Sequence, residues 1–121
     1  MRAVLVPTTG GPDVLQVRTL PAPEPGPDEL LIEVAASGVN FIDVYRREGV
    51  YAAATPFVLG QECAGRVVAI GSDVRNVSLG DVVATSEAYH GSHATLAAIP
   101  AEQSVPVPAG VAPDIAAAAL L

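Results

Sequence analysis

Polar side chains that can act on a ligand oxygen gather in one stretch of the chain, from Ser37 to Val67. Amide and hydroxyl groups can donate hydrogen bonds to an oxygen on which charge develops, and they are most effective in a dry cleft. The stretch offers two amides, Asn40 and Gln61, and two phenol hydroxyls, Tyr45 and Tyr51, and its carboxylates include Asp43, which lies between Asn40 and Tyr45 in sequence. We take Asn40, Asp43, Tyr45 and Tyr51 as the candidate catalytic residues.

Asn40 and Asp43 each have a structural interpretation as well. An asparagine directly before a helical pattern can be a helix cap and nothing more, and the residues alone leave cap and ligand contact equally open for Asn40. Asp43 is more typical of a group that orients its neighbours, with Arg47 as the expected partner, than of a general base.

The two tyrosines and Gln61 also carry alternatives. Tyr45 shares a helical face with Phe41, which is typical of an aromatic core contact. Tyr51 falls in a predicted loop, which makes it the better candidate for substrate contact. Gln61 could instead form a hydrogen bond that stabilises its own strand.

Four neighbouring residues are assigned structural roles. Cys63, the single cysteine, lies in an apolar strand and is expected to be a small buried side chain. His90 and His93 flank a Gly-Ser turn, and we expect an exposed pair rather than a metal site because no third ligand is near in sequence. Glu62 is expected to form an internal ion pair or a backbone contact.

Composition limits the class of protein. The 121 residues are half apolar and form one domain that is large enough for a core. The net charge of −7 and the scattered arginines argue against a nucleic-acid partner. A single cysteine fits a reducing, cytoplasmic setting. No apolar run approaches membrane-spanning length, so we expect a soluble protein that does not bind membranes.

Short β-prone runs separated by Gly and Pro turns predict a mainly β fold, a barrel or a sandwich. The expected strands cover residues 3–6, 14–20, 30–36, 58–71, 81–85, 94–99 and 105–108. The period changes to that of a helix from Asn40 to Glu48, with Gly49 as its end. A second helix is predicted to start at Pro113.

Two features indicate that these residues belong to a longer protein. The predicted helix from Pro113 to Leu121 has no residue that would close its last turn, so we expect the chain to stop inside this helix. No Gly-rich turn that opens a helix is present to hold a pyrophosphate. We expect such a motif beyond Leu121.

Several motifs occur in a fixed order. Gly65-x-Val67-x-x-x-Gly71 is followed by Gly80-Asp81-x-Val83, and both come after Gly38-Val39-Asn40-Phe41-Ile42-Asp43-x-Tyr45-x-Arg47-x-Gly49-x-Tyr51. The first two resemble the signature of the medium-chain dehydrogenase/reductase superfamily. The third resembles its zinc-independent quinone oxidoreductase branch, the zeta-crystallin-like reductases. The resemblance covers essentially the whole chain.

This resemblance implies a fold and a domain organisation. Residues 1–121 are expected to form a GroES-like, partly open β-barrel with a few short helices. This barrel would be the catalytic, substrate-side domain of an enzyme whose nucleotide-binding domain follows.

Two positions in the resemblance bear on metal binding. The zinc-dependent members of the superfamily carry Cys where Asn40 stands and His where Gln61 stands, and amides are poor zinc ligands. They also carry a lobe with four thiolates after the Gly-Asp-x-Val strand, whereas Ala84 to Ala94 contains no cysteine. The resemblance therefore implies that both zinc ions are absent.

The activity implied by the resemblance is hydride transfer from NADPH to a quinone. Asn40, Tyr45 and Gln61 are the residues expected to contact NADP(H). The intact protein is expected to be a homodimer, and residues 1–121 alone are expected to be inactive. Two alternatives stay open: an enoyl or alkenal reductase of the same superfamily, and a stand-alone GroES-like module in protein assembly or scaffolding.

Overall fold

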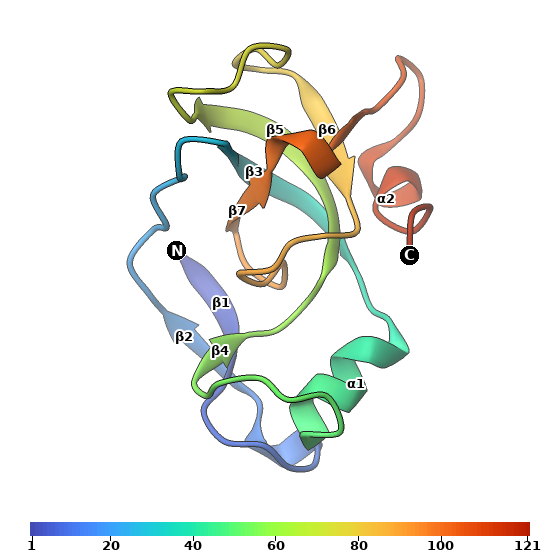
Figure 1. Cartoon of the computed structure of the whole chain (residues 1–121). Coiled ribbons are helices and arrows are strands. Elements are labelled where there is room, and N and C mark those ends of the chain that lie inside the picture. Colours follow the sequence, from blue (N-terminus) through green and yellow to red (C-terminus); the bar gives the residue numbers. More distant parts are fainter.

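The computed structural model describes residues 1–121 and is built mainly from β-strands (Figure 1). The strands are β1 (Arg2–Val6), β2 (Gln16–Thr19), β3 (Glu29–Gly38), β4 (Phe57–Val58), β5 (Glu62–Ile70), β6 (Val82–Thr85), β7 (Leu96–Pro100) and β8 (Val105–Pro106). The α-helices are α1 (Phe41–Glu48) and α2 (Pro113–Ala116), and single 3-10 turns cover Pro12–Val14 and Ala101–Gln103.

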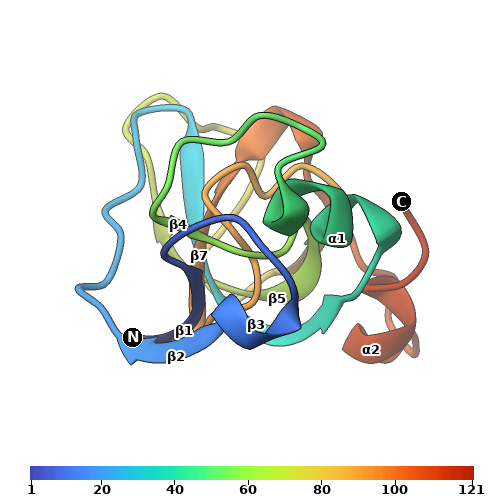
Figure 2. The same ribbon diagram turned by 90° about the horizontal axis from the view of Figure 1, so that it is seen from below.

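Two antiparallel sheets enclose the core. The larger has the strand order β7-β3-β5-β6-β8, and the smaller has the order β2-β1-β4. A bridge between Ala3 and Ala94 joins the two, supported by a hydrogen bond of 2.8 Å from the Val4 N–H to the His93 carbonyl. Figures 1 and 2 show the larger sheet curling around the core, with α1 and α2 on the same side of it. This arrangement confirms the prediction of a mainly β, partly open barrel with a few short helices.

The core is aliphatic, as the low aromatic content requires. One buried cluster joins β3, β5, β6 and β7 and consists of Leu30, Ile32, Cys63, Val67, Val83, Ala88, Ala97 and Ile99. Leu30 and Ile32 point inward from alternate positions of β3 and are fully buried. Burying a Leu or Ile side chain contributes about 1.5–3 kcal/mol, so this pattern fixes the face that β3 presents to the core.

Strands β3 and β5 carry the candidate site at their adjoining ends. Their pairing runs from Leu30 opposite Ile70 to Gly38 opposite Glu62, with two register shifts along β3. Gly65 makes the close approach possible, because a Cβ at this position would collide with the Glu33 carbonyl oxygen. The pairing therefore places the residues after Gly38 next to those around Glu62.

Helix α1 follows β3 directly and confirms the predicted change of period. Asn40 is its N-cap in extended conformation, and Gly49 ends it with a φ of 84°, a left-handed conformation that favours glycine. The amphipathic interpretation was wrong in one respect, because Phe41 and Tyr45 are 77% and 40% exposed and the residues buried on the helix are Asp43 and Arg47. An aromatic core role for Tyr45 is thus contradicted.

Several element boundaries differ from the prediction. The single strand predicted for residues 58–71 is wrong, because residues 59–61 interrupt it and separate β4 from β5. The second strand begins at Gln16 because residues 12–14 form a 3-10 turn. Helix α2 ends at Ala116, and the turn tightens through an Ala118 N–H bond to the Ile115 carbonyl. The N–H groups of Leu120 and Leu121 donate to the Glu62 carboxylate instead of continuing the helix.

The helices are all short, and none has the length and apolar character needed to cross a bilayer.

Candidate functional site

Three aromatic rings on α1 and the loop after it form an exposed surface, here called the aromatic face: Phe41, Tyr45 and Tyr51. The ring centroids of Phe41 and Tyr45 are 6.4 Å apart, and those of Tyr45 and Tyr51 are 5.6 Å apart in an edge-to-face arrangement. The loop folds back because the Val50 and Tyr51 N–H groups both donate to the Tyr45 carbonyl. Tyr51 is 53% exposed, so both predicted tyrosines lie together with their rings accessible.

Asn40 stands at the start of this face and is half-buried. Its Nδ2 donates a hydrogen bond of 2.9 Å to Glu62 Oε2. Its backbone N–H donates to Asp43 Oδ2, also at 2.9 Å, which is the carboxylate side of a capping box. Asn40 is therefore a helix cap whose side-chain amide is held by a partner 22 residues away.

Glu62 is a buried acid that accepts hydrogen bonds from three N–H donors. It is 1% exposed, and Oε1 accepts bonds of 2.8 Å from the Leu120 N–H and 3.1 Å from the Leu121 N–H. A buried carboxylate is tolerated only when such donors replace its hydration. The predicted backbone contact of Glu62 is thus confirmed, and its link to Asn40 adds a role that the local sequence did not indicate.

Asp43 lies behind the aromatic face, because it is only 2% exposed. Oδ2 accepts from Asn40, and Oδ1 has no hydrogen-bond partner. The predicted pairing with Arg47 is wrong: the Arg47 guanidinium donates to the Gly10 carbonyl at 3.1 Å and to Glu48 at 3.0 Å. The orienting effect of Asp43 therefore reaches Asn40, and its assignment as a catalytic residue stays a prediction.

His93 lies beside Asp43 and Ser37, among the polar side chains near the start of α1. His93 Nδ1 is 2.7 Å from Ser37 Oγ, and its Nε2 is 3.8 Å from Asp43 Oδ2. Burial lowers the pKa of His93, and the nearby Asp43 carboxylate opposes that shift. The expected exposed histidine pair is correct for His90, which is exposed and contacts Glu29 at 3.1 Å, and wrong for His93.

Gln61 and Cys63 are the sequence neighbours of Glu62. Gln61 lies just before β5, and Cys63 lies on it. Gln61 is half-buried, its carbonyl accepts from the Ala88 N–H at 2.9 Å, and its side-chain amide makes no hydrogen bond within the chain. Cys63 is fully buried, as predicted, and burial together with the Glu62 charge raises the pKa of its thiol to about 12. The thiol is thus an inert core group, whereas the Gln61 amide remains free to contact a ligand.

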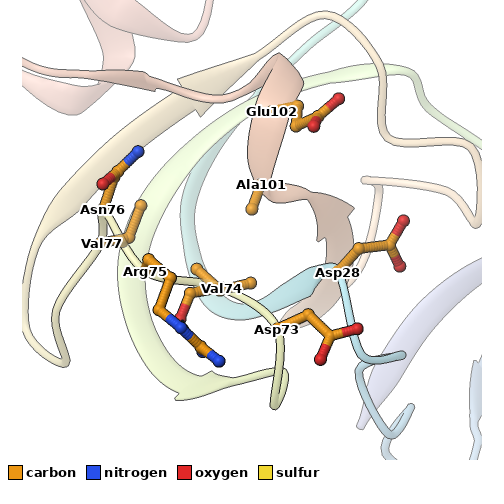
Figure 3. Close-up of a pocket in the computed structure, with 8 residues that line it drawn as sticks. All are labelled: Asp28, Asp73, Val74, Arg75, Asn76, Val77, Ala101 and Glu102. Carbon is orange, nitrogen blue, oxygen red and sulfur yellow. The ribbon is translucent and has the colours of Figure 1, made fainter.

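Two pockets of the domain differ in their relation to the predicted site residues. A pocket of about 350 Å³ lies between the loop at residues 73–77 and the turn at Ala101–Glu102, with Val74, Val77 and Ala101 as its apolar floor (Figure 3). None of the predicted site residues lines it. A second pocket of about 270 Å³ lies on the Asp43 side of α1 and includes Val44, Leu59 and His93.

The arrangement of donors bears on metal binding. No three His, Cys, Asp or Glu side chains lie close enough together to hold a metal ion. Asn40 and Gln61 present amides, which suit hydrogen bonding to a ligand oxygen better than zinc coordination. The zinc-free character of the protein stays a prediction.

Sequence reasoning missed the partners of the site more than the site itself. Glu62, Ser37 and His93 were not proposed as site residues. Glu62 bonds to Asn40, His93 lies beside Asp43, and Ser37 contacts His93. One signal was available for Glu62, because a charged residue between apolar strand residues is rarely buried without a partner. No local signal marked His93, whose contacts with Ser37 and Asp43 join residues far apart in sequence.

Comparisons with known proteins agree with this geometry. The model of the alcohol dehydrogenase GroES-like domain family matches residues 26–109. The quinone oxidoreductase of Pseudomonas aeruginosa is 42% identical over 113 residues, which cover 93% of this chain and 35% of that protein. The crystal structure of Escherichia coli quinone oxidoreductase complexed with NADPH is 33% identical, with a TM-score of 0.95 over 98% of this chain and 37% of that one. A mycobacterial quinone oxidoreductase is 43% identical, with a TM-score of 0.93 over 97% of this chain and 36% of that one.

Fold and comparisons together define a GroES-like domain of the medium-chain dehydrogenase/reductase superfamily. Within that class, the chain belongs to the alcohol dehydrogenase GroES-like domain family and to its quinone oxidoreductase branch. The chain spans about a third of the length of the curated relatives that it matches.

Proposed function

We propose that this domain forms the substrate side of an NADPH-dependent quinone oxidoreductase that transfers hydride to a quinone without zinc. The observation that carries the proposal is the half-buried Asn40 amide, held by Glu62 at the start of the aromatic face. A nucleotide-binding domain after Leu121 would complete the enzyme, which we expect to be a cytoplasmic homodimer.

The residues of the site would act through position and hydrogen bonding. The Asn40 amide and the Tyr51 hydroxyl donate to the quinone oxygen, where negative charge grows as the ring is reduced. The rings of Tyr45 and Tyr51 offer apolar surfaces against which a flat quinone can pack. Asp43 acts indirectly, by holding the backbone of Asn40.

The residues present fit only one end of the nicotinamide cofactor. When bound, NADPH supplies the hydride, and Asn40, Tyr45 and Gln61 would contact its nicotinamide side. The exposed Tyr45 ring and the unpaired Gln61 amide are suited to that contact. The described residues contain no Gly-rich turn that opens a helix and could bind the pyrophosphate, so the rest of NADPH would be held by the following domain.

The proposal is tested by comparing rate and stability in the intact protein. Asn40→Ala and Tyr51→Phe are expected to lower NADPH:quinone turnover by about a hundredfold or more, since each removes a donor to the developing charge. Melting temperatures should change little. Tyr89→Phe is the matched control, because Tyr89 is also an exposed tyrosine, 55% exposed, and bonds to Gln103.

Three outcomes would contradict parts of the proposal. Wild-type turnover in both variants would remove these residues from the site. An Asn40→Ala variant that is less stable by about 1 kcal/mol but turns over normally per folded molecule would leave Asn40 as a helix cap only. A protein that reduces 2-alkenals and ignores quinones would be the alkenal reductase of the same superfamily.

A further inference from the structure

Glu62 is the one buried acid whose two oxygens hold separate parts of the domain. Oε2 accepts from Asn40 Nδ2, and Oε1 accepts from the backbone N–H groups of Leu120 and Leu121. The side chain is 1% exposed, so water does not compete for these bonds. The carboxylate therefore joins the start of α1 to the segment after α2.

A carboxylate can accept hydrogen bonds but cannot donate them. It thereby determines which end of the Asn40 amide faces β5, since only the NH₂ group can bond to it. That NH₂ group carries two protons, and the structure uses one of them, in the bond to Glu62. The second N–H is left as a donor at the start of the aromatic face.

The packing around Glu62 leaves it little freedom to move. A Cβ at Gly38 would lie 2.6 Å from Glu62 Oε2 and 2.6 Å from the Ala117 carbonyl oxygen. The carboxylate thus fills space that only a glycine at position 38 provides. Because Oε1 and Oε2 belong to one rigid group, a shift of the Leu120–Leu121 backbone would turn the carboxylate and move the amide of Asn40.

We propose that Glu62 is a positioning residue: it fixes the Asn40 amide with a free N–H directed to the substrate oxygen, and it couples that donor to the Leu120–Leu121 segment. The kinetic consequence rests on the function proposed above. The hydrogen bond itself does not depend on that function, so the two can fail separately.

The decisive variant exchanges the two partners, combining Asn40→Asp with Glu62→Gln. The new amide at position 62 can donate to the new carboxylate at position 40, while its carbonyl oxygen still accepts from Leu120 and Leu121. The pair of hydrogen bonds is retained, but position 40 loses its donor. We expect the double variant of the intact protein to regain most of the melting temperature lost in Glu62→Gln alone, while quinone turnover stays at least about a hundredfold below wild type.

A merely structural role for Glu62 predicts a different result. If the exchange restored both melting temperature and turnover, the donor on Asn40 would be irrelevant and the proposal would be overturned. Glu102→Gln is the control for loss of a carboxylate outside the site, since Glu102 lies on the rim of the pocket in Figure 3, and it should leave both quantities unchanged.

A measurement on the wild-type protein decides the matter if the variants do not fold. In the ¹⁵N-labelled intact protein, one Asn40 side-chain N–H is expected to be shifted downfield by its carboxylate acceptor and to exchange slowly with water. Asn76, the other asparagine of these residues, is exposed and supplies the internal reference. Asn40 side-chain signals that match those of Asn76 would overturn the proposal, and a lack of quinone turnover alone would count only against the proposed function.

Discussion

Gly38→Ala tests the packing that surrounds Glu62. The added Cβ would stand 2.6 Å from Glu62 Oε2 and from the Ala117 carbonyl oxygen, well inside the 3.4 Å at which ordinary contact begins. Neither oxygen can move away easily. Glu62 Oε2 belongs to a buried carboxylate that accepts three hydrogen bonds, and the Ala117 oxygen belongs to the backbone. Overpacking of this kind typically costs about 1–3 kcal/mol.

One effect opposes that cost. Replacing glycine by alanine restricts the unfolded chain and stabilises the folded one by about 0.4–1 kcal/mol. The net expectation is a loss of about 1–2 kcal/mol, and at roughly 3–5 °C per kcal/mol for a domain of this size the melting temperature should fall by about 3–10 °C. Thermal and urea unfolding of the 121-residue chain, followed by circular dichroism, would measure it.

Gly11→Ala is the matched control for this prediction. Nothing lies within 4 Å of a Cβ at Gly11, and its φ of −71° suits alanine. This variant should melt at the wild-type temperature or slightly above it. If Gly38→Ala melted within about 1 °C of Gly11→Ala, the close contact among Gly38, Glu62 and Ala117 would not exist and the reasoning would be refuted.

Three further predictions concern His93, Cys63 and zinc. Burial lowers the pKa of His93, so the contribution of His93 to stability is fully present above its ordinary pKa of 6.5 and is lost as the pH falls. The melting temperature should therefore fall more steeply on acidification in wild type than in His93→Gln. Equal slopes would contradict this. The Cys63 thiol, with its pKa raised to about 12, should resist iodoacetamide in the native chain and react fully in urea, as read by mass spectrometry; native alkylation would show that it is accessible. Intact protein exposed to zinc and desalted should retain well under one equivalent by elemental analysis, and stoichiometric retention through Cys63 or His93 would overturn the zinc-free prediction.

The sequence predicted the elements well where the signals were local. The strand that became β3 and the helix that follows it were indicated by a change of period, an Asn cap and a closing Gly49, and all three are present. Such signals involve residues within a few positions of one another, and therefore do not depend on the rest of the fold.

The outward and inward faces of α1 were not predictable in the same way. Helical spacing placed Phe41 and Tyr45 on one face, and an apolar face usually packs on the core. Here the buried face instead carries Asp43, which accepts a hydrogen bond from the Asn40 N–H, and Arg47, which donates one to the Gly10 carbonyl. The partner of Arg47 is 37 residues away in sequence, and hydrophobic periodicity contains no information about such a contact.

The candidate site likewise contains residues that local patterns predicted and residues that they did not. Asn40, Tyr45 and Tyr51 were found because amide and hydroxyl groups occurred at recognisable spacings. Glu62 and His93, which hold the site from behind, depend on strand register and on a bridge between distant segments. Contacts of this kind, which depend on how distant segments pair in the folded barrel, cannot be predicted from a local sequence pattern.

The edges of the larger sheet bear on how the domain avoids self-association. Its outer strands are β7 and β8, and an exposed edge strand is a template for aggregation through backbone pairing. β8 is two residues long and includes Pro106, while β7 ends at Pro100; proline lacks the N–H that an added strand would need. Residues just before β7 are already paired with β1 through Ala94. The chain thus leaves neither edge as a long run of free donors, which should keep the β-rich domain from forming intermolecular sheets at high concentration.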